Sequence, residues 1–542
     1  MELIKTISGL LWGTPLIVLI LAAGLIFTLG SKFFQVTNFG HIMKNTIGTL
    51  FSKKSADGVQ GKGMMKPLEV ISIAIGGAVG VGNIGGVATA IAVGGPGAVF
   101  WIWLAAFLGM MMKMAEVALA VYYRSKDGKG GYYGGPTYYM QKGLGRDKGF
   151  KFWGVLAVIF GIGIFGNVFS MQNFTVSQAV NATFGVPVLA ISLVYVALTY
   201  LATVREIPWL GKVASIVVPP MCLFYLAGGI VIILMNIANL PASLALIVKS
   251  AFTGTAASGA FMGASVALVI RTGFARAMFS NEAGWGTSPM IHASAKTEHP
   301  VKQGLWGSFE VFVDTMLVCT VTGLVIVVTG KWNSGLDGPA LTLSAFESVL
   351  GPVGSIIITV GVFLFGLSTT SGWWAYFEVL LRHLCGENEK LKKTLINIFK
   401  VVYPIPGFLV VLLYALGSDV SGADIWAIAD LTTGVPAFIN LVVIIFLSGK
   451  FFQLLKDYRA RTWAGAKSIP TLNFLTRMCR PPSPPLRKTD STPSFQRSAP
   501  ACCRSGASFS SALVPRPPSS YNESTLTPER RPPIWKASCS TP

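Results

Sequence analysis

The stretch IAIGGAVGVGNIGG, residues 73–86, decides how this chain folds. From residue 76 to residue 86, six of the eleven positions are glycine, and each glycine inside a helix costs about 1 kcal/mol relative to alanine. Apolar sequence surrounds this stretch from 67 to 93, which is long enough to cross a bilayer. We therefore expect a membrane-spanning helix that breaks near its middle.

A break inside lipid leaves backbone groups that need partners, because no water is present to bind them. Freed carbonyl oxygens can bind a cation, and the N–H groups where the helix restarts can bind a carboxylate. Asn83 adds a side-chain carbonyl oxygen. Close helix packing through small residues such as Gly76 and Gly80 is the competing explanation. The GxGxxG pattern at 80–85 does not indicate a dinucleotide site, since that motif requires a preceding strand and a soluble helix.

The composition of the whole chain agrees with a membrane protein. Of the 542 residues, 52% are hydrophobic and 12% are charged, whereas soluble domains carry about 25% charged residues. The mean hydropathy is +0.60. We expect an all-α polytopic fold with about eleven membrane spans, at roughly 11–30, 67–93, 96–121, 152–180, 186–204, 213–236, 256–281, 305–329, 354–381, 395–416 and 422–447.

The net charge of +20 is explained by topology. In the loops after odd-numbered spans there are 24 Lys and Arg residues, Arg271 and Arg276 among them, against three on the other side. Positive loops stay in the cytoplasm. We therefore expect a multi-pass protein of the cell membrane with its N-terminus outside and its C-terminus inside, in contact with the lipid bilayer and with no nucleic acid as partner.

The odd number of spans suggests one helix plus a repeat. Without the first span, ten remain, and they divide into two sets of five with opposite orientation, as in many secondary transporters. The expected organisation is an N-terminal helix with its loop, a first repeat, a second repeat and a cytoplasmic, largely disordered tail, at 1–66, 67–236, 237–449 and 450–542.

Two further spans carry polar side chains in apolar sequence. Gln172 shares a helix face with bulky apolar residues, so its amide is expected to bond either another helix or a ligand. Residues 368–371 are four consecutive hydroxyl residues. Paired hydroxyls with a carbonyl one turn earlier form half of a site for a hard cation such as sodium, although a single hydroxyl usually bonds its own helix. Thr369 and Trp373 are four residues apart and lie on one face.

Ionisable residues inside the spans are candidates for function. Glu116 has Lys113 one turn away, and an internal ion pair between them is one interpretation. Asp314 lies inside the eighth span. We expect no metal cluster of His or Cys residues and no nucleophile, so the chain is not expected to be an enzyme.

Six motifs resemble the alanine/glycine:cation symporter family, also called the sodium:alanine symporter family. They lie in order along the chain: GNIGGVATAI (82–91), GGPGAVFW (94–101), GGPTYY (134–139), FSNEAGWG (279–286), HPVKQG (299–304) and FGLSTTSGW (365–373). The resemblance extends from about residue 10 to about residue 465. It implies a leucine-transporter-type fold of two inverted five-helix repeats with an extra N-terminal helix.

The resemblance also implies roles for individual residues. A sodium ion would be bound by the backbone carbonyls of Gly76 and Val79 and by the side chains of Ser368 and Thr369. The amino-acid substrate would contact Ala78, Gly80, Gly82 (near the substrate carboxylate), Asn83, Gln172, Thr369 and Trp373.

The chain departs from the family pattern at two places. Trp285 stands where many relatives have Leu, and Thr370-Ser371 where Ile-Leu is frequent. The family fold also requires a second broken helix, in span 256–281. The candidate break points there are Gly259, Gly263 and Gly273.

The C-terminal sequence does not fit the rest. Residues 470–542 hold 14 of the 30 prolines and four of the seven cysteines. Such Pro/Ser/Arg-rich sequence cannot bury a core and is expected to be disordered. We interpret it as a frameshifted or otherwise altered ending after about residue 466. The alternatives are a genuine tail that binds anionic lipid or a tail that binds a partner.

The sequence thus predicts a secondary transporter that couples inward sodium flow to uptake of small neutral amino acids, alanine or glycine, with sodium as the coupling ion and no cofactor. Proton coupling through Asp314 or Glu116 is the first alternative. A membrane amino-acid sensor without transport is the second.

Overall fold

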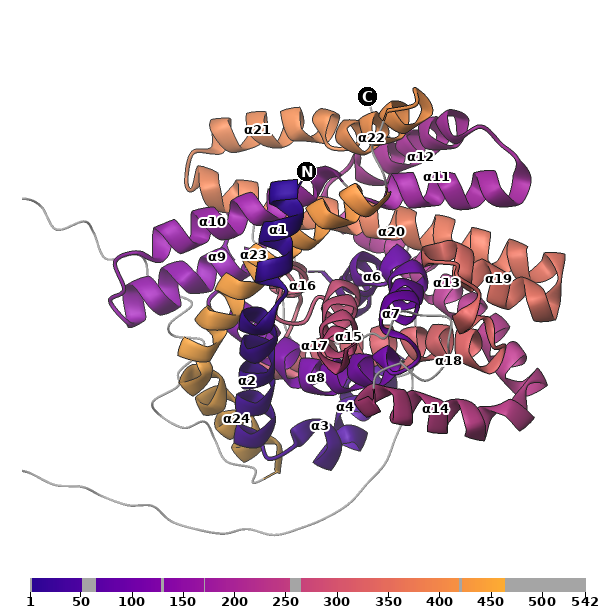
Figure 1. The fold of residues 1–542 in the computed structure, drawn as a ribbon. Helices are drawn as coiled ribbons and strands as arrows, with labels where there is room; N and C mark the ends of the chain where they lie inside the picture. The colour runs from indigo at the N-terminus through magenta and orange to yellow at the C-terminus, as the bar shows by residue number, and fades with distance from the viewer. Residues whose placement is uncertain are drawn as a thin grey trace, which may run out of the picture. The chain divides into compact units, whose positions relative to one another are not determined.

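The computed structural model describes residues 2–50, 65–127, 131–169, 171–253, 265–418 and 422–463. These residues are mostly helical, and the strands among them are β1 (Ser125–Lys126) and β2 (Tyr132–Tyr133), which pair antiparallel (Figure 1). Eight of the described helices are long and apolar enough to cross a membrane, or nine if one broken pair counts as a span. The expected all-α, polytopic architecture is confirmed.

The helices of the N-terminal half follow the expected spans. They are α1 (Glu2–Leu11), α2 (Thr14–Gly30), α3 (Phe34–Thr37), α4 (Phe39–Asn45), α5 (Ile47–Leu50), α6 (Pro67–Ala78), η1 (Gly82–Gly86), α7 (Val87–Gly94), α8 (Ala98–Tyr122), α9 (Pro136–Tyr139), η2 (Met140–Asp147), α10 (Trp153–Gly166), η3 (Asn167–Phe169), α11 (Met171–Phe184), α12 (Val188–Thr203) and α13 (Ile207–Met235).

The C-terminal half continues with helices of similar length. They are η4 (Ile237–Asn239), α14 (Leu240–Thr253), α15 (Val266–Asn281), α16 (Ser288–His292), α17 (Pro300–Val311), η5 (Phe312–Cys319), α18 (Thr320–Val328), η6 (Lys331–Asn333), α19 (Gly338–Leu350), α20 (Pro352–Cys385), α21 (Glu389–Val402), α22 (Ile405–Ala415), α23 (Gly422–Phe446) and α24 (Ser448–Trp463).

Two expected spans are shorter than a full membrane crossing. The span at 186–204 is α12, and the described part of the span at 256–281 is α15; each has 16 residues. Arg271 and Arg276 lie inside α15, so the prediction that they belong to a basic loop was wrong. The other nine expected spans coincide with apolar helices or with the broken pair.

The first helix break lies inside the glycine-rich stretch. Helix α6 ends at Ala78, and the chain restarts at Gly82 after a bend of 47°. The long helix α20 packs against this break, and a Cβ atom at Gly80 would lie 2.5 Å from the Thr369 hydroxyl oxygen. Only glycine allows the two segments to approach this closely.

The second break follows α15. Glu282 adopts a left-handed conformation with φ 55°, Gly284 and Gly286 have φ 88°, and α16 begins at Ser288. Gly273 was expected as a break point, but it lies inside the continuous helix α15, packed against Trp101. Gly259 and Gly263 lie outside the described residues.

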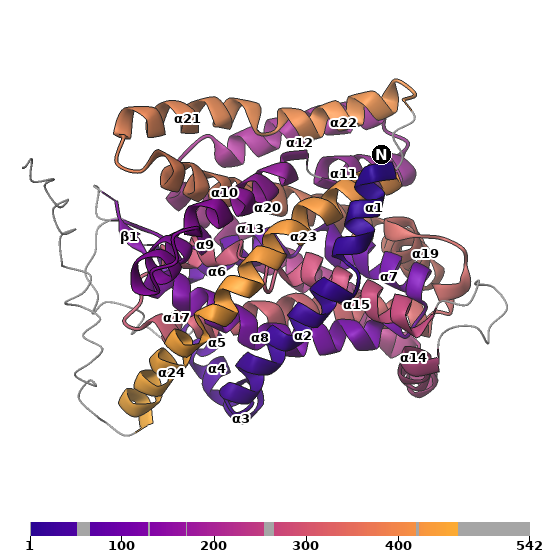
Figure 2. The ribbon, with the colours of Figure 1, turned by 60° about the vertical axis from the view of Figure 1, so that its left-hand side comes forward.

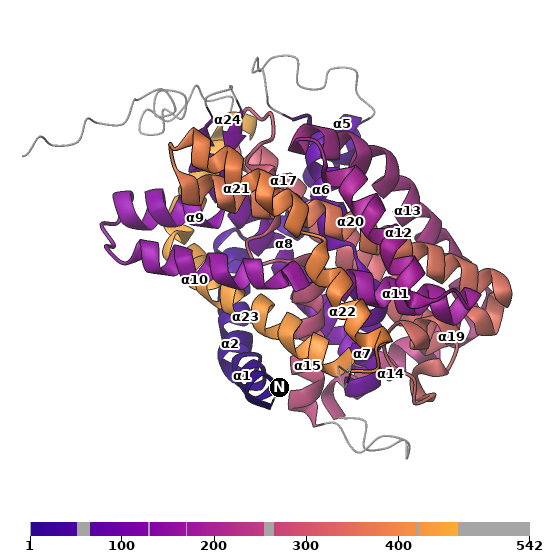
Figure 3. The same ribbon diagram turned by 90° about the horizontal axis from the view of Figure 1, so that it is seen from above.

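The N-terminal helices pack along the C-terminal ones. Helices α1 and α2 lie beside α23, and the Trp12 indole N–H donates to the carbonyl of Asp430 at 2.8 Å (Figure 2). Helix α2 also packs on α8, where Gly24 meets Leu108. Helix α22 packs against α11 and α12 (Figure 3). The first span is therefore an integral part of the fold.

The loops between helices also contact one another. The guanidinium of Arg124 donates to the carbonyls of Ala293 and Ala295 at 3.1 and 2.9 Å. His41 lies 2.9 Å from the hydroxyl of Tyr458 in α24. Helix α24 is the beginning of the expected tail, and it is packed through buried Phe451, Leu454 and Leu455. Residues 464–542, the remainder of that tail, lie outside the described residues.

Candidate functional site

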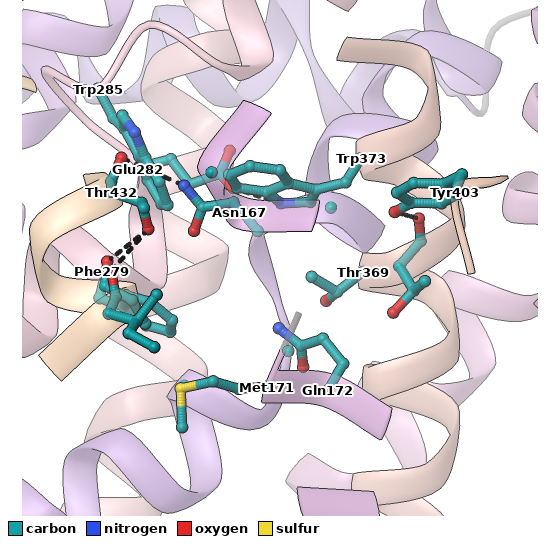
Figure 4. Close-up of a pocket in the computed structure, with 18 residues that line it drawn as sticks. Asn167, Met171, Gln172, Phe279, Glu282, Trp285, Thr369, Trp373, Tyr403 and Thr432 are labelled. Atoms are coloured by element: carbon teal, nitrogen blue, oxygen red, sulfur yellow. Dashed lines mark hydrogen bonds between the residues drawn. The ribbon is translucent and has the colours of Figure 1, made fainter. Parts of the chain in front are cut away.

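A cavity that is partly open to its surroundings lies where the two broken helices face α11, α20 and α23 (Figure 4). Both breaks contribute backbone to it, so the positions of the two glycine-rich segments determine its shape. Its lining residues are Gly77, Ala78, Gly80, Gly82, Gly166, Asn167, Met171, Gln172, Phe279, Glu282, Trp285, Thr369, Thr370, Trp373, Tyr403, Ile428, Ala429 and Thr432.

Six of the seven residues expected to contact substrate line this cavity. They are Ala78, Gly80, Gly82, Gln172, Thr369 and Trp373. They come from the first break and from helices α11 and α20, which are separated along the chain by up to about 300 residues. The fold therefore brings together side chains that only the family resemblance had connected.

Asn83 is the exception, because its amide is held elsewhere. Its Nδ2 donates to the Asp314 carboxylate at 2.7 Å, and its Oδ1 accepts from the Gly80 N–H at 2.9 Å. The structure places Asn83 behind the break, where it supports the unwound backbone, and not in the cavity wall. The predicted direct substrate contact does not match this position.

Gln172 fits both roles that the sequence left open, a bond to another helix and a contact with a ligand. Its Oε1 accepts a hydrogen bond from the N–H of Val81 at 3.4 Å, which ties α11 to the first break. The same side chain lines the cavity, and in Figure 4 it lies just below Thr369. It thus connects the unwound segment with the space that a ligand would occupy.

The four residues expected to bind sodium also lie together. The Thr369 hydroxyl donates to the carbonyls of Gly76 and Val79 at 3.1 and 3.3 Å. The Ser368 hydroxyl turns back to the carbonyl of Phe365 at 3.0 Å, and its oxygen lies 3.9 Å from where a Cβ atom of Gly76 would be. Neutral carbonyl and hydroxyl oxygens suit a hard, singly charged cation. Among the described residues, no group of three His, Cys, Asp or Glu side chains is arranged to hold a metal.

Two tryptophans form an apolar wall of the cavity. The rings of Trp285 and Trp373 meet edge to face, with centroids 5.0 Å apart. Trp285 is one of the positions where the chain departs from the family pattern, so this departure changes the cavity itself. Thr370, from the other departure, also lines the cavity, but its hydroxyl bonds the Tyr195 hydroxyl at 2.7 Å.

Glu282 is a lining residue that the sequence reasoning missed. It is 1% exposed, and its carboxylate accepts from the Trp373 indole N–H at 3.0 Å and from the Thr287 hydroxyl at 2.5 Å. The signal was present in the motif FSNEAGWG, where an acid at the end of an apolar span precedes two glycines. Trp373 was expected only as a flat apolar surface, yet its polar edge holds this carboxylate.

The buried ionisable residues pair differently from the expectation. Lys113 lies 3.3 Å from Glu310, a residue on α17, and not beside Glu116. Glu116 instead accepts hydrogen bonds from the N–H of Gly284 at 3.1 Å and from the Asn440 amide. The predicted pair between Lys113 and Glu116 was wrong because the partners come from distant helices that meet only in the fold.

Asp314 is fully buried next to the first break. Besides Asn83, its carboxylate accepts from the hydroxyls of Ser280 and Thr315, each at 2.7 Å. All three donors are neutral, so within the described structure this carboxylate has hydrogen bonds and no ion pair. It links the first break, through Asn83, with α15, through Ser280.

Comparisons with known proteins agree with this arrangement. The family model of the "Sodium:alanine symporter family" matches residues 1–472. The "Sodium/alanine symporter AgcS" of Methanococcus maripaludis is 36% identical over 83% of this chain and 95% of that protein. The "Putative sodium/proton-dependent alanine carrier protein YrbD" of Bacillus subtilis is 32% identical over 86% of this chain and 94% of that protein. Among solved structures, MhsT in complex with L-phenylalanine superposes with a TM-score of 0.52 at 15% identity, covering 78% of this chain and 94% of that one.

Proposed function

Because the chain belongs to the sodium:alanine symporter family and shares the leucine-transporter-type fold, we propose that it carries alanine and glycine into the cell together with sodium. The family and its relatives are transporters, so the chain is a multi-pass membrane transporter and not an enzyme. The proposal concerns the substrates, the coupling ion and the direction of transport.

The observation that carries the proposal is the position of Thr369. Its hydroxyl bonds the carbonyls of Gly76 and Val79, the predicted sodium ligands, while the residue also lines the cavity. An ion at these oxygens and a substrate in the cavity would both hold the first break against α20. Two ligands that favour the same arrangement of the protein bind cooperatively, which is the basis of coupled transport.

The substrate's carboxylate is expected at the restart of the first broken helix. Gly82 begins η1 there, and the first N–H groups of a helix carry partial positive charge. On the other side of the cavity, Trp285 and Trp373 leave an apolar wall for the substrate side chain. Such a wall favours a small neutral side chain over a charged or long one.

Transport in proteoliposomes tests the proposal. Purified protein reconstituted into vesicles should accumulate radiolabelled alanine when an inward sodium gradient is imposed, and choline in place of sodium should abolish the accumulation. Competition by unlabelled glycine and by larger amino acids would then order the substrates. Absence of sodium-driven uptake of both alanine and glycine would contradict the proposal, and binding without accumulation would indicate a sensor.

Proton coupling is the second candidate, and Asp314 favours it. Its buried carboxylate bonds Asn83 beside the first break and Ser280 in α15, so a change in its protonation would act on both broken helices. Uptake of alanine driven by a pH gradient in sodium-free buffer would support this mechanism. Asp314→Asn should abolish pH-driven uptake while Glu116→Gln retains it, because Glu116 does not contact the first break.

We also propose that the protein lies in the cell membrane with its N-terminus outside and its C-terminus in the cytoplasm. Contacts between the basic loops support this orientation: Arg124 reaches Ala293 and Ala295, and Arg459 of α24 donates to the carbonyl of Ser31 at 2.7 Å. These segments therefore share one side of the bilayer. Single cysteines placed at residues 126 and 331 of a cysteine-free variant should react with an impermeant maleimide from the inside and the outside, respectively.

A further inference from the structure

We propose that the Glu282 carboxylate binds the ammonium group of the substrate and thereby selects amino acids over other small carboxylates. The inference rests on the proposed function, because it takes the substrate to be a zwitterion. Glu282 lines the cavity, and the indole of Trp373 extends across the cavity toward it (Figure 4).

The first argument is that Glu282 is a buried carboxylate that forms no direct ion pair with a described residue, and the Lys113 ammonium acts on it only at longer range. The groups that donate to it are neutral: the Trp373 indole and the Thr287 hydroxyl, with the Tyr376 hydroxyl also interacting with it. The buried cations nearby are engaged elsewhere, since Lys113 pairs with Glu310 and Arg276 pairs with Asp430. A buried charge without a counter-charge is strongly unfavourable. A cationic ligand group in the adjoining cavity would supply the missing counter-charge.

The second argument is the capacity of the carboxylate itself. A carboxylate has about four acceptor positions on its two oxygens. Trp373 donates to Oε1, Thr287 donates to Oε2, and the Tyr376 hydroxyl also interacts with the carboxylate, so acceptor capacity remains after all three contacts. An ammonium group presents three donors and matches such an acceptor. The existing contacts thus fix the position of the carboxylate without saturating it.

The third argument comes from the helix on which Glu282 lies. It is the first residue after α15, at the end where a helix carries partial negative charge. The backbone there is left-handed, with φ 55°, which is unfavourable for a residue with a side chain. A carboxylate at this end raises the local negative potential, and this potential attracts a cation into the cavity.

The two breaks present helix ends of opposite partial charge to the same cavity. Phe279, one turn before Glu282, approaches the first break so closely that a Cβ atom at Gly82 would lie 2.9 Å from its ring. The negative end of α15 and the positive restart at Gly82 therefore adjoin one cavity. An α-amino acid carries its ammonium and carboxylate groups on one carbon, so a single small molecule can satisfy both helix ends.

The test compares alanine with L-lactate, in which a hydroxyl replaces the ammonium group. In full-length protein reconstituted in nanodiscs, sodium-dependent binding should favour alanine over lactate by about 100-fold, which corresponds to about 2.8 kcal/mol and lies within the range for a buried, charged hydrogen bond. Glu282→Gln removes the charge and keeps the shape, so the preference should fall below about tenfold. Glu378→Gln, a matched change of a buried carboxylate that bonds Arg382 and does not line the cavity, should keep the wild-type preference.

Three outcomes would overturn the inference. The first is a wild-type preference that persists in Glu282→Gln. The second is an equal loss of affinity for alanine and lactate, which would mean that the carboxylate only positions Trp373. The third is a Glu282→Asp variant, which keeps the charge, that shows no preference for alanine. If sodium alone fails to stabilise Glu282→Gln, that variant is judged not to fold. Glu282→Asp then decides the question. Failure of wild-type protein to take up alanine in a sodium gradient would instead contradict the proposed function.

Discussion

At the scale of single residues, we expect coupling to depend on Thr369. Its hydroxyl bonds two backbone carbonyls of the first break, whereas the adjacent Thr370 bonds Tyr195 on α12. Thr369→Ala should raise the sodium concentration for half-maximal uptake about tenfold, because one lost oxygen ligand of 1–2 kcal/mol corresponds to that factor. Gln172→Ala should weaken uptake similarly by releasing the unwound backbone.

Thr370→Ala is the matched control for this series. Its lost hydroxyl contacts another side chain and not the break, so uptake should change less than about threefold. Sodium titrations of alanine uptake for the three variants would measure the difference. Equal effects at Thr369 and Thr370 would contradict the role given to the Thr369 hydroxyl.

We expect Trp285 to limit the size of the substrate that fits the cavity. Its ring packs against Trp373, and both line the cavity. Trp285→Leu removes part of this wall, so larger neutral amino acids such as valine should inhibit alanine uptake about tenfold more strongly, as expected when one or two methylenes gain room. Inhibition constants for glycine, valine and leucine in both proteins would measure this, and an unchanged order would exclude a steric role.

Contacts between residues that are far apart in the sequence could not be predicted from the sequence. The helical spacing of Lys113 and Glu116 suggested a local pair, but the lysine pairs with Glu310 on another helix. Asn83 was expected to face the substrate, but its amide bonds Asp314, which is 231 residues away. Local spacing shows which residues share a face, and only the fold determines what that face meets.

At the scale of elements, the first break depends on glycine because α20 approaches it so closely. Gly80→Ala would place a Cβ atom 2.5 Å from the Thr369 hydroxyl oxygen, so it should lower sodium affinity and alanine uptake at least about tenfold. Gly161→Ala in α10 is the control, since a Cβ atom there meets nothing within 4 Å. Alanine should stabilise that helix by about 0.5–1 kcal/mol.

Sodium-dependent melting temperatures and uptake of both variants would check this prediction. Gly80→Ala should remain folded in detergent but lose the stabilisation that sodium gives. If both variants transported like the wild type, the close approach of α20 would not matter for function.

The two breaks differ in how far the sequence reveals them. The first has six glycines between residues 76 and 86, and a helix with this composition is unfavourable in any context. The second has two glycines, Gly284 and Gly286, within a segment that contains Glu282 and Trp285. Its unwinding is supported by long-range bonds, such as that from the Gly284 N–H to Glu116. Glycine positions alone therefore suggested Gly273, which lies inside the continuous helix α15.

Helix α24 is attached through histidines outside the membrane spans, so its docking should depend on pH. His299 lies 3.2 Å from Asp457, and burial, the largest effect, lowers the pKa of His299 below its usual 6.5 even though Asp457 raises it. Burial also lowers the pKa of His41, which contacts Tyr458. Both imidazoles are kept neutral in the docked state, while an undocked histidine binds a proton as pH falls below about 6.5. Acid therefore favours undocking.

Hydrogen exchange of the α24 amides would measure this effect. Exchange, corrected for its intrinsic pH dependence, should be faster at pH 5.5 than at pH 7.5. His299→Asn keeps an acceptor for the N–H of Val301 at the start of α17 but cannot titrate, so its pH dependence should be smaller. Protection that is independent of pH in the wild type would contradict the prediction.

At the scale of the whole molecule, composition and hydropathy were sufficient to predict the architecture. A chain with 12% charged residues and long apolar segments has few alternatives to a bundle of membrane helices. Nine expected spans coincide with apolar helices or the broken pair. Of the other two, α12 has 16 residues, and the described part of the span at 256–281 begins only at Val266.

The bond from Trp12 to the carbonyl of Asp430 has a consequence for the symmetry of transport. Helices α1 and α2 contact α8, from the first five-helix set, and α23, from the second. They therefore connect one helix of the first set with one helix of the second. Because α1 and α2 belong to neither five-helix set, the symmetry that relates the two sets gives them no counterpart. The outward-open and inward-open states are then not mirror images, and in the absence of any gradient they have no symmetry reason to be equally populated.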